Sequence, residues 1–160
     1  MPNYIIKDVT TNAPIPVGNL ADQINSLTVV RREDMRDAHW ELFLHTTAGG
    51  TVKVDLMQAG YRVLFGANLF IGNGASSEQL TLGAPQTLGQ VITAVQQVGN
   101  ARGDWTGTDA YNCQDFVFAF MRHIGMSSAQ MFPYELRRKA TKLYPPTITE
   151  RVNGVVQTHY

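Results

Sequence analysis

The sequence predicts an α+β fold in which a mainly antiparallel sheet packs against two or three helices. Residues 39–58 show the two-residue alternation of a β-hairpin, residues 87–99 show helical spacing of apolar side chains, and a second helical pattern begins at Cys113. With 160 residues, of which 44% are hydrophobic, the chain has enough apolar side chains for a core of its own. A single domain over residues 1–160 is therefore expected.

The N-terminal part of the chain is expected to open the sheet. Apolar and aromatic residues favour a first strand within residues 3–10, and the prolines of residues 12–18 indicate a loop. A short helix is expected over residues 19–26, followed by a strand over residues 27–32.

The clearest strand pattern covers residues 39–46 and 51–58, with Ala-Gly-Gly at residues 48–50 as the turn. Apolar residues at the even positions of both segments alternate with mostly polar ones, as in half-buried strands. In the expected register Leu42 pairs near Leu56. Further short strands are predicted at residues 61–65, 68–71 and 78–82, with a turn at 72–74.

The first helix is predicted from Thr87, which can form a capping box with Gln90, to Gly99 as its stop. The second is predicted over residues 113–124, ended by Gly125. A third is expected over residues 133–143, before Pro145 and Pro146, and Asn153-Gly154 predicts a closing hairpin.

Composition excludes several functional classes. The 13 basic and 13 acidic residues cancel, so no basic field is available for a nucleic acid. The single cysteine cannot form an internal disulfide, and the N-terminus lacks the apolar run of a secretory signal or a membrane span. A cytoplasmic protein is therefore expected. No cofactor is predicted.

Cys113 is the candidate nucleophile. Asn112 suits an N-cap position and Asp115 can complete a capping box, which would place Cys113 at the first helical position. Backbone amides and the helix dipole stabilise a thiolate there, and the same amides could hold an oxyanion. Alternatively, Cys113 shares a face with Phe116 and Phe120 and could be a small buried apolar residue.

Of the four histidines, His39 is the candidate base. His123 lies late on the same helix as the cysteine, His159 lies next to the C-terminus, and His45 lies near the hairpin turn. His39 begins the strongest strand, from which an imidazole could meet the start of a helix within hydrogen-bond reach of its thiol.

Asp55 is the candidate third residue, because it shares a strand face with His39 and could orient the imidazole. Gln58 is the alternative if the register slips by one residue, and Asp55 could equally be an exposed carboxylate. His39 could share a face with Glu41 or His45, but no second cluster of ligands accompanies them, so no metal site is expected.

The motif His-Trp-Glu-Leu-Phe-Leu at residues 39–44, followed by Tyr-Asn-Cys-Gln-Asp-Phe-Val at residues 111–117, resembles the circularly permuted papain-like group. That group includes permuted NlpC/P60 domains, lecithin-retinol-acyltransferase-like proteins and PPPDE deubiquitinase-like peptidases. The resemblance covers residues 39–125 and implies a papain-like fold and a thioester on Cys113, with His39 as base. The third polar residue, often a histidine on the second strand of the group, has no histidine counterpart here.

These observations predict a cysteine-dependent hydrolase, such as a thiol protease, or an acyltransferase. It would act on an amide, isopeptide or ester bond of a peptide, amide or ester substrate through Cys113, His39 and Asp55. The alternative is a non-enzymatic binding or inhibitory domain that retains the fold.

Overall fold

The computed structural model describes residues 2–32, 39–69, 75–106, 111–131, 148–152 and 155–159. Its architecture is α+β, as the sequence predicts. The elements in chain order are β1 (Tyr4–Asp8), the 3-10 helix η1 (Val17–Ala21), β2 (Gln23–Arg32), β3 (His39–Thr46), β4 (Thr51–Met57), β5 (Gly60–Phe65), β6 (Ala75–Thr87), α1 (Leu88–Arg102), α2 (Cys113–His123), β7 (Ile148–Val152) and β8 (Val155–His159).

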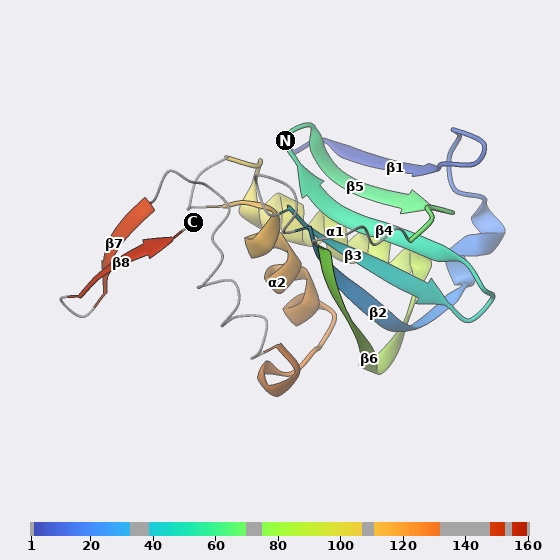
Figure 1. Cartoon of the computed structure of the whole chain (residues 1–160). Helices are drawn as coiled ribbons and strands as arrows, with labels where there is room; N and C mark the ends of the chain where they lie inside the picture. The colour runs from blue at the N-terminus through green and yellow to red at the C-terminus, as the bar shows by residue number, and fades with distance from the viewer. Residues whose placement is uncertain are drawn as a thin grey trace.

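Six strands form one sheet in the order β1-β5-β4-β3-β2-β6 (Figure 1). Only the β1–β5 pair of this sheet is parallel, so the predicted mainly antiparallel sheet is confirmed. β7 and β8 form a separate antiparallel pair in which Val152 faces Val155. This pairing agrees with the predicted closing hairpin, although residues 153–154 themselves lie outside the described residues.

The core lies between one face of the sheet and the helices α1 and α2. Even-numbered residues of β3, such as Trp40 and Leu42, join one apolar cluster with Val95 of α1 and with Phe116 and Phe120 of α2. Each such side chain contributes roughly 1.5–3 kcal/mol when fully buried. The alternation seen in the sequence therefore directs the even positions of the hairpin toward the helices.

The predicted helix over residues 19–26 is wrong. A 3-10 helix occupies only Val17–Ala21, and β2 already starts at Gln23. Ile24 is fully buried and pairs with both Thr46 of β3 and Gln86 of β6. Pairing on both sides outweighs the weak local helical preference of this segment.

Gly99 does not end the first helix. α1 continues to Arg102 and ends at Gly103, which has the left-handed φ of 86° that favours glycine. At Gly99 a Cβ atom would lie 2.5 Å from the Tyr4 hydroxyl, so the glycine allows Tyr4 to approach the helix. The predicted capping box of Thr87 and Gln90 is confirmed.

Other strand predictions are confirmed in part. Strands are found where they were predicted at residues 61–65 and 78–82, and β6 is longer than expected. Residues 68–69 are not in a strand, whereas residues 70–71, the turn at 72–74 and the third helix at 133–143 lie outside the described residues.

The hairpin register also differs from the prediction. Leu42 pairs with Val54 instead of a position near Leu56. This two-residue difference leaves every side chain on its predicted face, since strand side chains alternate with a period of two.

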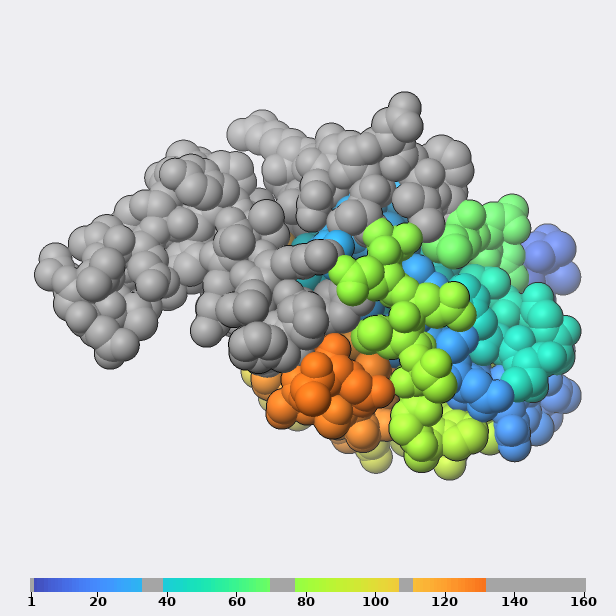
Figure 2. All heavy atoms as spheres, turned by 60° about the horizontal axis from the view of Figure 1, so that its bottom comes forward, coloured from blue at the N-terminus to red at the C-terminus, as the bar shows by residue number. Residues whose placement is uncertain are grey.

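β6 forms one edge of the sheet, and the segment after α2 contacts it. The Gln130 amide nitrogen donates a hydrogen bond to the Thr81 carbonyl over 3.1 Å. Figure 2 shows β6 in light green at the surface beside the orange segment that follows α2. None of the helices in the described part of the chain combines the length and apolar character that crossing a bilayer would require.

Candidate active site

The start of α2 is built as the sequence predicts. The Asn112 side-chain oxygen accepts hydrogen bonds from the amides of Gln114 at 3.0 Å and Asp115 at 3.3 Å. In return, the Asp115 carboxylate accepts a hydrogen bond from the Asn112 amide at 3.0 Å. This capping box places Cys113 at the first helical position.

Two tyrosines fix the loop that precedes this helix. The hydroxyl oxygens of Tyr61 and Tyr111 are 2.8 Å apart, and Tyr61 donates a hydrogen bond to the Gly103 carbonyl at 2.6 Å. Burial raises the pKa of both phenols, that of Tyr61 to about 12. Tyr111 therefore packs the loop onto β5, and Trp105 is partly buried against the core.

Cys113 lies at the junction of α2 and β3. Its side chain is buried, and its sulfur accepts a hydrogen bond from the Trp40 amide at 3.4 Å. The Asn112 cap engages the amides of Gln114 and Asp115 but not the amide of Cys113 itself.

His39 connects Cys113 with Asp55. Its Nε2 atom lies 2.9 Å from the Asp55 Oδ2 atom, and the Cys113 side chain lies close enough to the ring to raise its pKa. Burial alone lowers the pKa of His39, but the hydrogen bonds and charges of Asp55 and Cys113 outweigh burial and raise this pKa to about 9. The imidazole is therefore charged at neutral pH.

Asp55 is fully buried, so the reading of it as an exposed carboxylate is wrong. Burial alone raises its pKa, but hydrogen bonds from Arg62 and His39, together with their charges, outweigh burial and lower the pKa to about 2. Gln58, the alternative third residue, is exposed in the turn after β4. The structure thus brings His39, Asp55 and Cys113 together from three different elements.

Glu41 is a second buried carboxylate on the same sheet face. Arg32 lies 2.6 Å and Lys53 2.9 Å from its oxygens, while His39 Nε2 is 3.8 Å away. The donor atoms of His39, Glu41 and Asp55 all lie within 4.8 Å of one another. Both carboxylates are nevertheless occupied by cationic side chains that would repel a metal ion, so this donor set suits ion pairs better than metal ligation.

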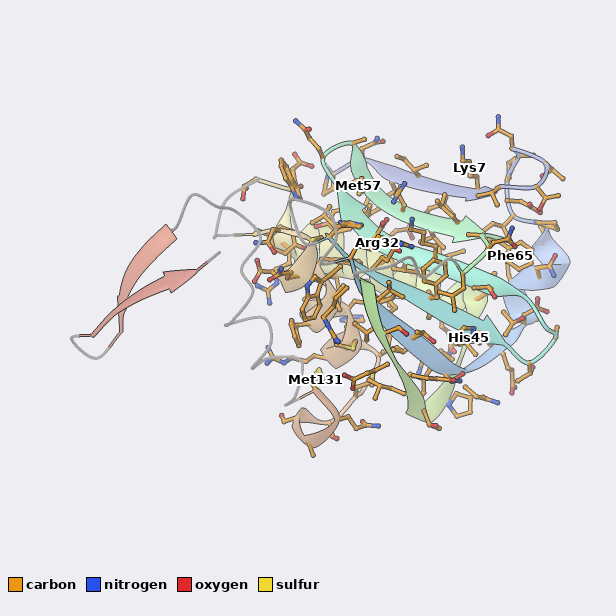
Figure 3. All side chains as sticks on the ribbon, in the orientation of Figure 1. Lys7, Arg32, His45, Met57, Phe65 and Met131 are labelled. Atoms are coloured by element: carbon orange, nitrogen blue, oxygen red, sulfur yellow. The ribbon has the colours of Figure 1, made fainter. Side chains whose placement is uncertain are left out.

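Two other histidines lie away from the sulfur. His45 Nε2 is 2.7 Å from the Thr28 hydroxyl, and burial lowers the pKa of His45. Arg32 is the register partner of His39. Figure 3 shows Arg32 and His45 toward opposite ends of the sheet. His123 bonds to Gln97 over 2.7 Å at the surface.

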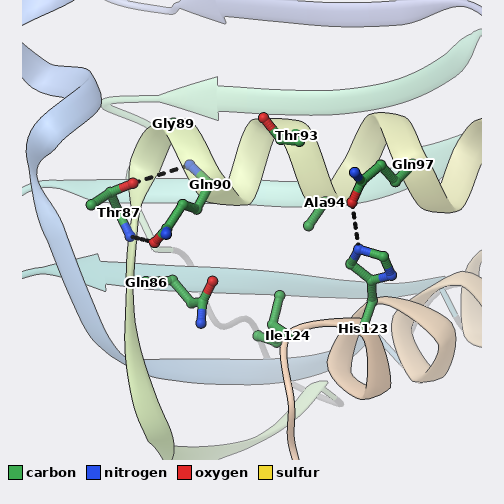
Figure 4. A pocket seen from close by; sticks show the side chains of 9 residues that line it. All are labelled: Gln86, Thr87, Gly89, Gln90, Thr93, Ala94, Gln97, His123 and Ile124. Carbon is green, nitrogen blue, oxygen red and sulfur yellow. Dashed lines mark hydrogen bonds between the residues drawn. The ribbon is translucent and has the colours of Figure 1, made fainter.

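A surface hollow of about 440 Å³ lies beside α1, where β6 joins it and α2 ends (Figure 4). Its polar lining includes Gln90, Gln97 and His123. Neither Cys113 nor His39 lines it, so this hollow is distinct from the candidate active site.

Sequence reasoning missed Arg62, whose guanidinium binds the Asp55 carboxylate, and the contacts of Glu41 with Arg32 and Lys53. The sequence signal that could have pointed to a role for Arg62 was its positive charge within the otherwise apolar strand of residues 61–65. Comparison with known protein families, with curated proteins and with solved structures finds no match for this chain. Function is therefore inferred from the site alone.

Proposed function

We propose that the protein is a cysteine-dependent hydrolase or acyltransferase that acts on an amide, isopeptide or ester carbonyl through a thioester on Cys113. The observation that supports this most is the position of His39, whose ring bonds to Asp55 at 2.9 Å and lies close enough to the Cys113 side chain to be affected by it. An imidazole held between a carboxylate and a thiol is the arrangement that thiol catalysis requires.

The charge of His39 determines what this residue does in the first step of the reaction. In this proposal the charged imidazolium of His39 acts first as the counter-ion that stabilises the thiolate during attack. This differs from the sequence-based expectation, in which His39 first acts as a base. Asp55 remains ionised and holds the ring through Nε2, which leaves Nδ1 as the nitrogen for the sulfur.

Catalysis then follows in two halves. The thiolate of Cys113 forms a bond to the carbonyl carbon, and the resulting oxyanion accepts a hydrogen bond from the Cys113 amide. His39 donates its proton to the departing amine or alcohol as the thioester forms. The now neutral His39 takes a proton from water, for hydrolysis, or from an acceptor nucleophile, for transfer, as that nucleophile forms a bond to the thioester carbon. The carbon–sulfur bond then breaks, the Cys113 thiolate leaves, and the acid or the transfer product is released.

The resemblance to the permuted papain-like group extends this proposal to the fold. A histidine on β3 precedes a cysteine at the start of α2, which is the order of elements in that group. In this proposal the substrate is a peptide, amide or ester in the cytoplasm, and no cofactor takes part.

The rate of Cys113 alkylation by iodoacetamide as a function of pH tests the proposal, and the single thiol makes the readout unambiguous. We expect alkylation to persist well below pH ~8.5, the usual thiol pKa. The His39→Asn variant should lose this low-pH reactivity, whereas His45→Asn, a change on the same strand, should keep it. A wild-type thiol that reacts only at alkaline pH would contradict the proposal.

One observation favours a second function, that of a non-enzymatic binding domain. Cys113 is only 1% exposed and belongs to the same apolar cluster as Phe116 and Phe120. A cysteine there can act as a small apolar core residue. This alternative predicts that the folded protein resists alkylation at every pH below its alkaline unfolding, and that Cys113→Ala leaves binding intact.

A further inference from the structure

We propose that Arg62 is a positioning residue of this site, and that it acts on His39 only through the Asp55 carboxylate. The inference rests on the proposed function, because it assigns a role to Arg62 in orienting the imidazole toward Cys113. Arg62 itself would contact neither the substrate nor the sulfur.

Arg62 and Asp55 form a bidentate ion pair across neighbouring strands. Asp55 of β4 and Arg62 of β5 are register partners. Arg62 Nε donates to Asp55 Oδ1 at 2.7 Å, and Nη2 donates to Oδ2 at 2.5 Å. Because the planar guanidinium engages both oxygens, it fixes the plane of the carboxylate as well as its charge.

Asp55 Oδ2 is shared between Arg62 and His39. The same oxygen that accepts from Arg62 Nη2 lies 2.9 Å from His39 Nε2. Burial would otherwise favour a neutral Asp55, since the carboxyl group is fully removed from water. Arg62 therefore keeps this oxygen negative and aimed at the imidazole.

Charged or titratable groups from every neighbouring element face His39 or its carboxylate partners. Glu41 lies 3.8 Å from the ring on the same strand, and β4 supplies Lys53 and Asp55. β2 supplies Arg32, β5 supplies Arg62, and α2 supplies Cys113. Arg32 contacts Glu41, whereas Arg62 contacts Asp55, the carboxylate that bonds to His39. Arg32 is thus a matched control on the same sheet face.

The first experiment follows the titration of the His39 ring by NMR in the substrate-free protein. The Arg62→Lys variant keeps the positive charge but cannot form the bidentate contact with the carboxylate. In this variant we expect the midpoint of the His39 titration to fall by about one pH unit or more, toward the ordinary value of ~6.5. Arg32→Lys should leave the midpoint within a few tenths of a unit. An unchanged His39 midpoint in Arg62→Lys, with only a lower melting temperature, would mean that Arg62 contributes to stability but does not position the imidazole. That result would overturn the inference.

A double-mutant cycle tests whether Arg62 acts only through Asp55. The double variant Asp55→Asn with Arg62→Gln leaves no unpaired buried charge from this pair, so it should fold even if the single Arg62 variants do not. We expect its His39 midpoint to equal that of Asp55→Asn alone. A further shift on adding Arg62→Gln would show a direct effect of Arg62 and would overturn the inference.

The two proposals fail in different ways. If wild-type Cys113 alkylates only at alkaline pH, the proposed function fails, and the His39 titration still decides the role of Arg62. If wild-type Cys113 is reactive and Arg62→Lys changes neither its alkylation profile nor the His39 midpoint, only the Arg62 inference fails.

Discussion

The Trp40 amide donates a hydrogen bond to the Cys113 sulfur over 3.4 Å, although the two residues are 73 positions apart in sequence. Trp40 directly follows His39, so one short stretch of β3 bonds to the sulfur through the Trp40 amide and also carries the imidazole whose pKa Cys113 raises. The position of the sulfur therefore depends on how the start of α2 docks against the start of β3. Changes at either start should alter the reactivity of the thiol.

Asn112→Ala tests the start of α2. The change removes the oxygen that accepts from the amides of Gln114 and Asp115, so we expect a loss of unfolding free energy of about 1–2 kcal/mol. Alkylation of Cys113 at neutral pH should also slow, because the sulfur is no longer held at a defined helix end. Urea denaturation and alkylation rates measure the two effects.

Thr87→Ala is the matched control for this variant, since it removes the equivalent capping box of α1. It should cost a similar free energy of unfolding but leave the alkylation rate of Cys113 unchanged. Equal slowing of alkylation in both variants would indicate a general loss of stability instead of a local effect on the sulfur.

The stability of the protein should depend on pH through His39 and Asp55. The pKa of His39 is raised from 6.5 to about 9 in the folded protein, so its contribution is complete below pH 6.5 and is lost as the pH rises through 9. The pKa of Asp55 is lowered from 3.8 to about 2, so its contribution is complete above pH 3.8 and is lost as the pH falls toward 2. Stability should therefore be greatest between these ranges.

Urea denaturation between pH 2 and pH 10 measures this dependence. The His39 shift corresponds to a decrease of at most about 3 kcal/mol between pH 6.5 and pH 9. His39→Gln should flatten that decrease, and it should also reduce the loss on the acid side, because His39 helps to lower the pKa of Asp55. A wild-type unfolding free energy that stays constant from pH 6 to pH 9.5 would contradict the assigned charge of His39.

Local patterns predicted the elements that carry the site and the three residues proposed to meet there, while the ion pairs around those residues escaped prediction. The alternation around Trp40 and the capping box at Asn112 are readable from a few neighbouring residues, and both are found in the structure. The sheet face on which Asp55 lies was predicted from the two-residue alternation of the strand alone. Arg62 was missed because its role arises from the pairing of β4 with β5, which the sequence of either strand does not specify.

The same limit explains the mistake at residues 19–26. Ile24 is strand-forming because β3 and β6 lie on both sides of β2, and neither neighbour is visible in the local sequence. At Gly99, likewise, the reason for a glycine is the ring of Tyr4, which is distant in sequence.

Gly99→Ala should therefore destabilise the protein, although alanine is the better helix former by about 1 kcal/mol. The added Cβ would lie 2.5 Å from the Tyr4 hydroxyl and 2.9 Å from a ring carbon, too close without movement of the ring. We expect a net loss of about 1–3 kcal/mol in the free energy of unfolding. In a Tyr4→Leu background the substitution should cost less, and an equal cost in both backgrounds would rule out this contact as the cause.

Tyr61→Phe should cost more stability than Tyr111→Phe. The Tyr61 hydroxyl carries one proton, which it donates to the Gly103 carbonyl at 2.6 Å, and its oxygen can accept the proton of Tyr111 at 2.8 Å. Removing the Tyr61 hydroxyl breaks both bonds and leaves Gly103 and Tyr111 without this partner, at a cost of about 1–3 kcal/mol. Removing the Tyr111 hydroxyl breaks only one bond and leaves the bond to Gly103 in place.

Both tyrosine variants keep the aromatic ring, so packing such as that of Tyr61 against Phe116, with ring centroids 5.1 Å apart, is retained. Urea denaturation of the two single variants and of the double variant separates the contributions. Tyr61→Phe already breaks the bond between the two hydroxyls. Adding Tyr111→Phe should therefore not destabilise the Tyr61→Phe protein further, because the second substitution only removes a buried hydroxyl that has already lost this partner. Additive losses, or a larger loss from Tyr111→Phe alone, would show that this assignment of donors and acceptors is wrong.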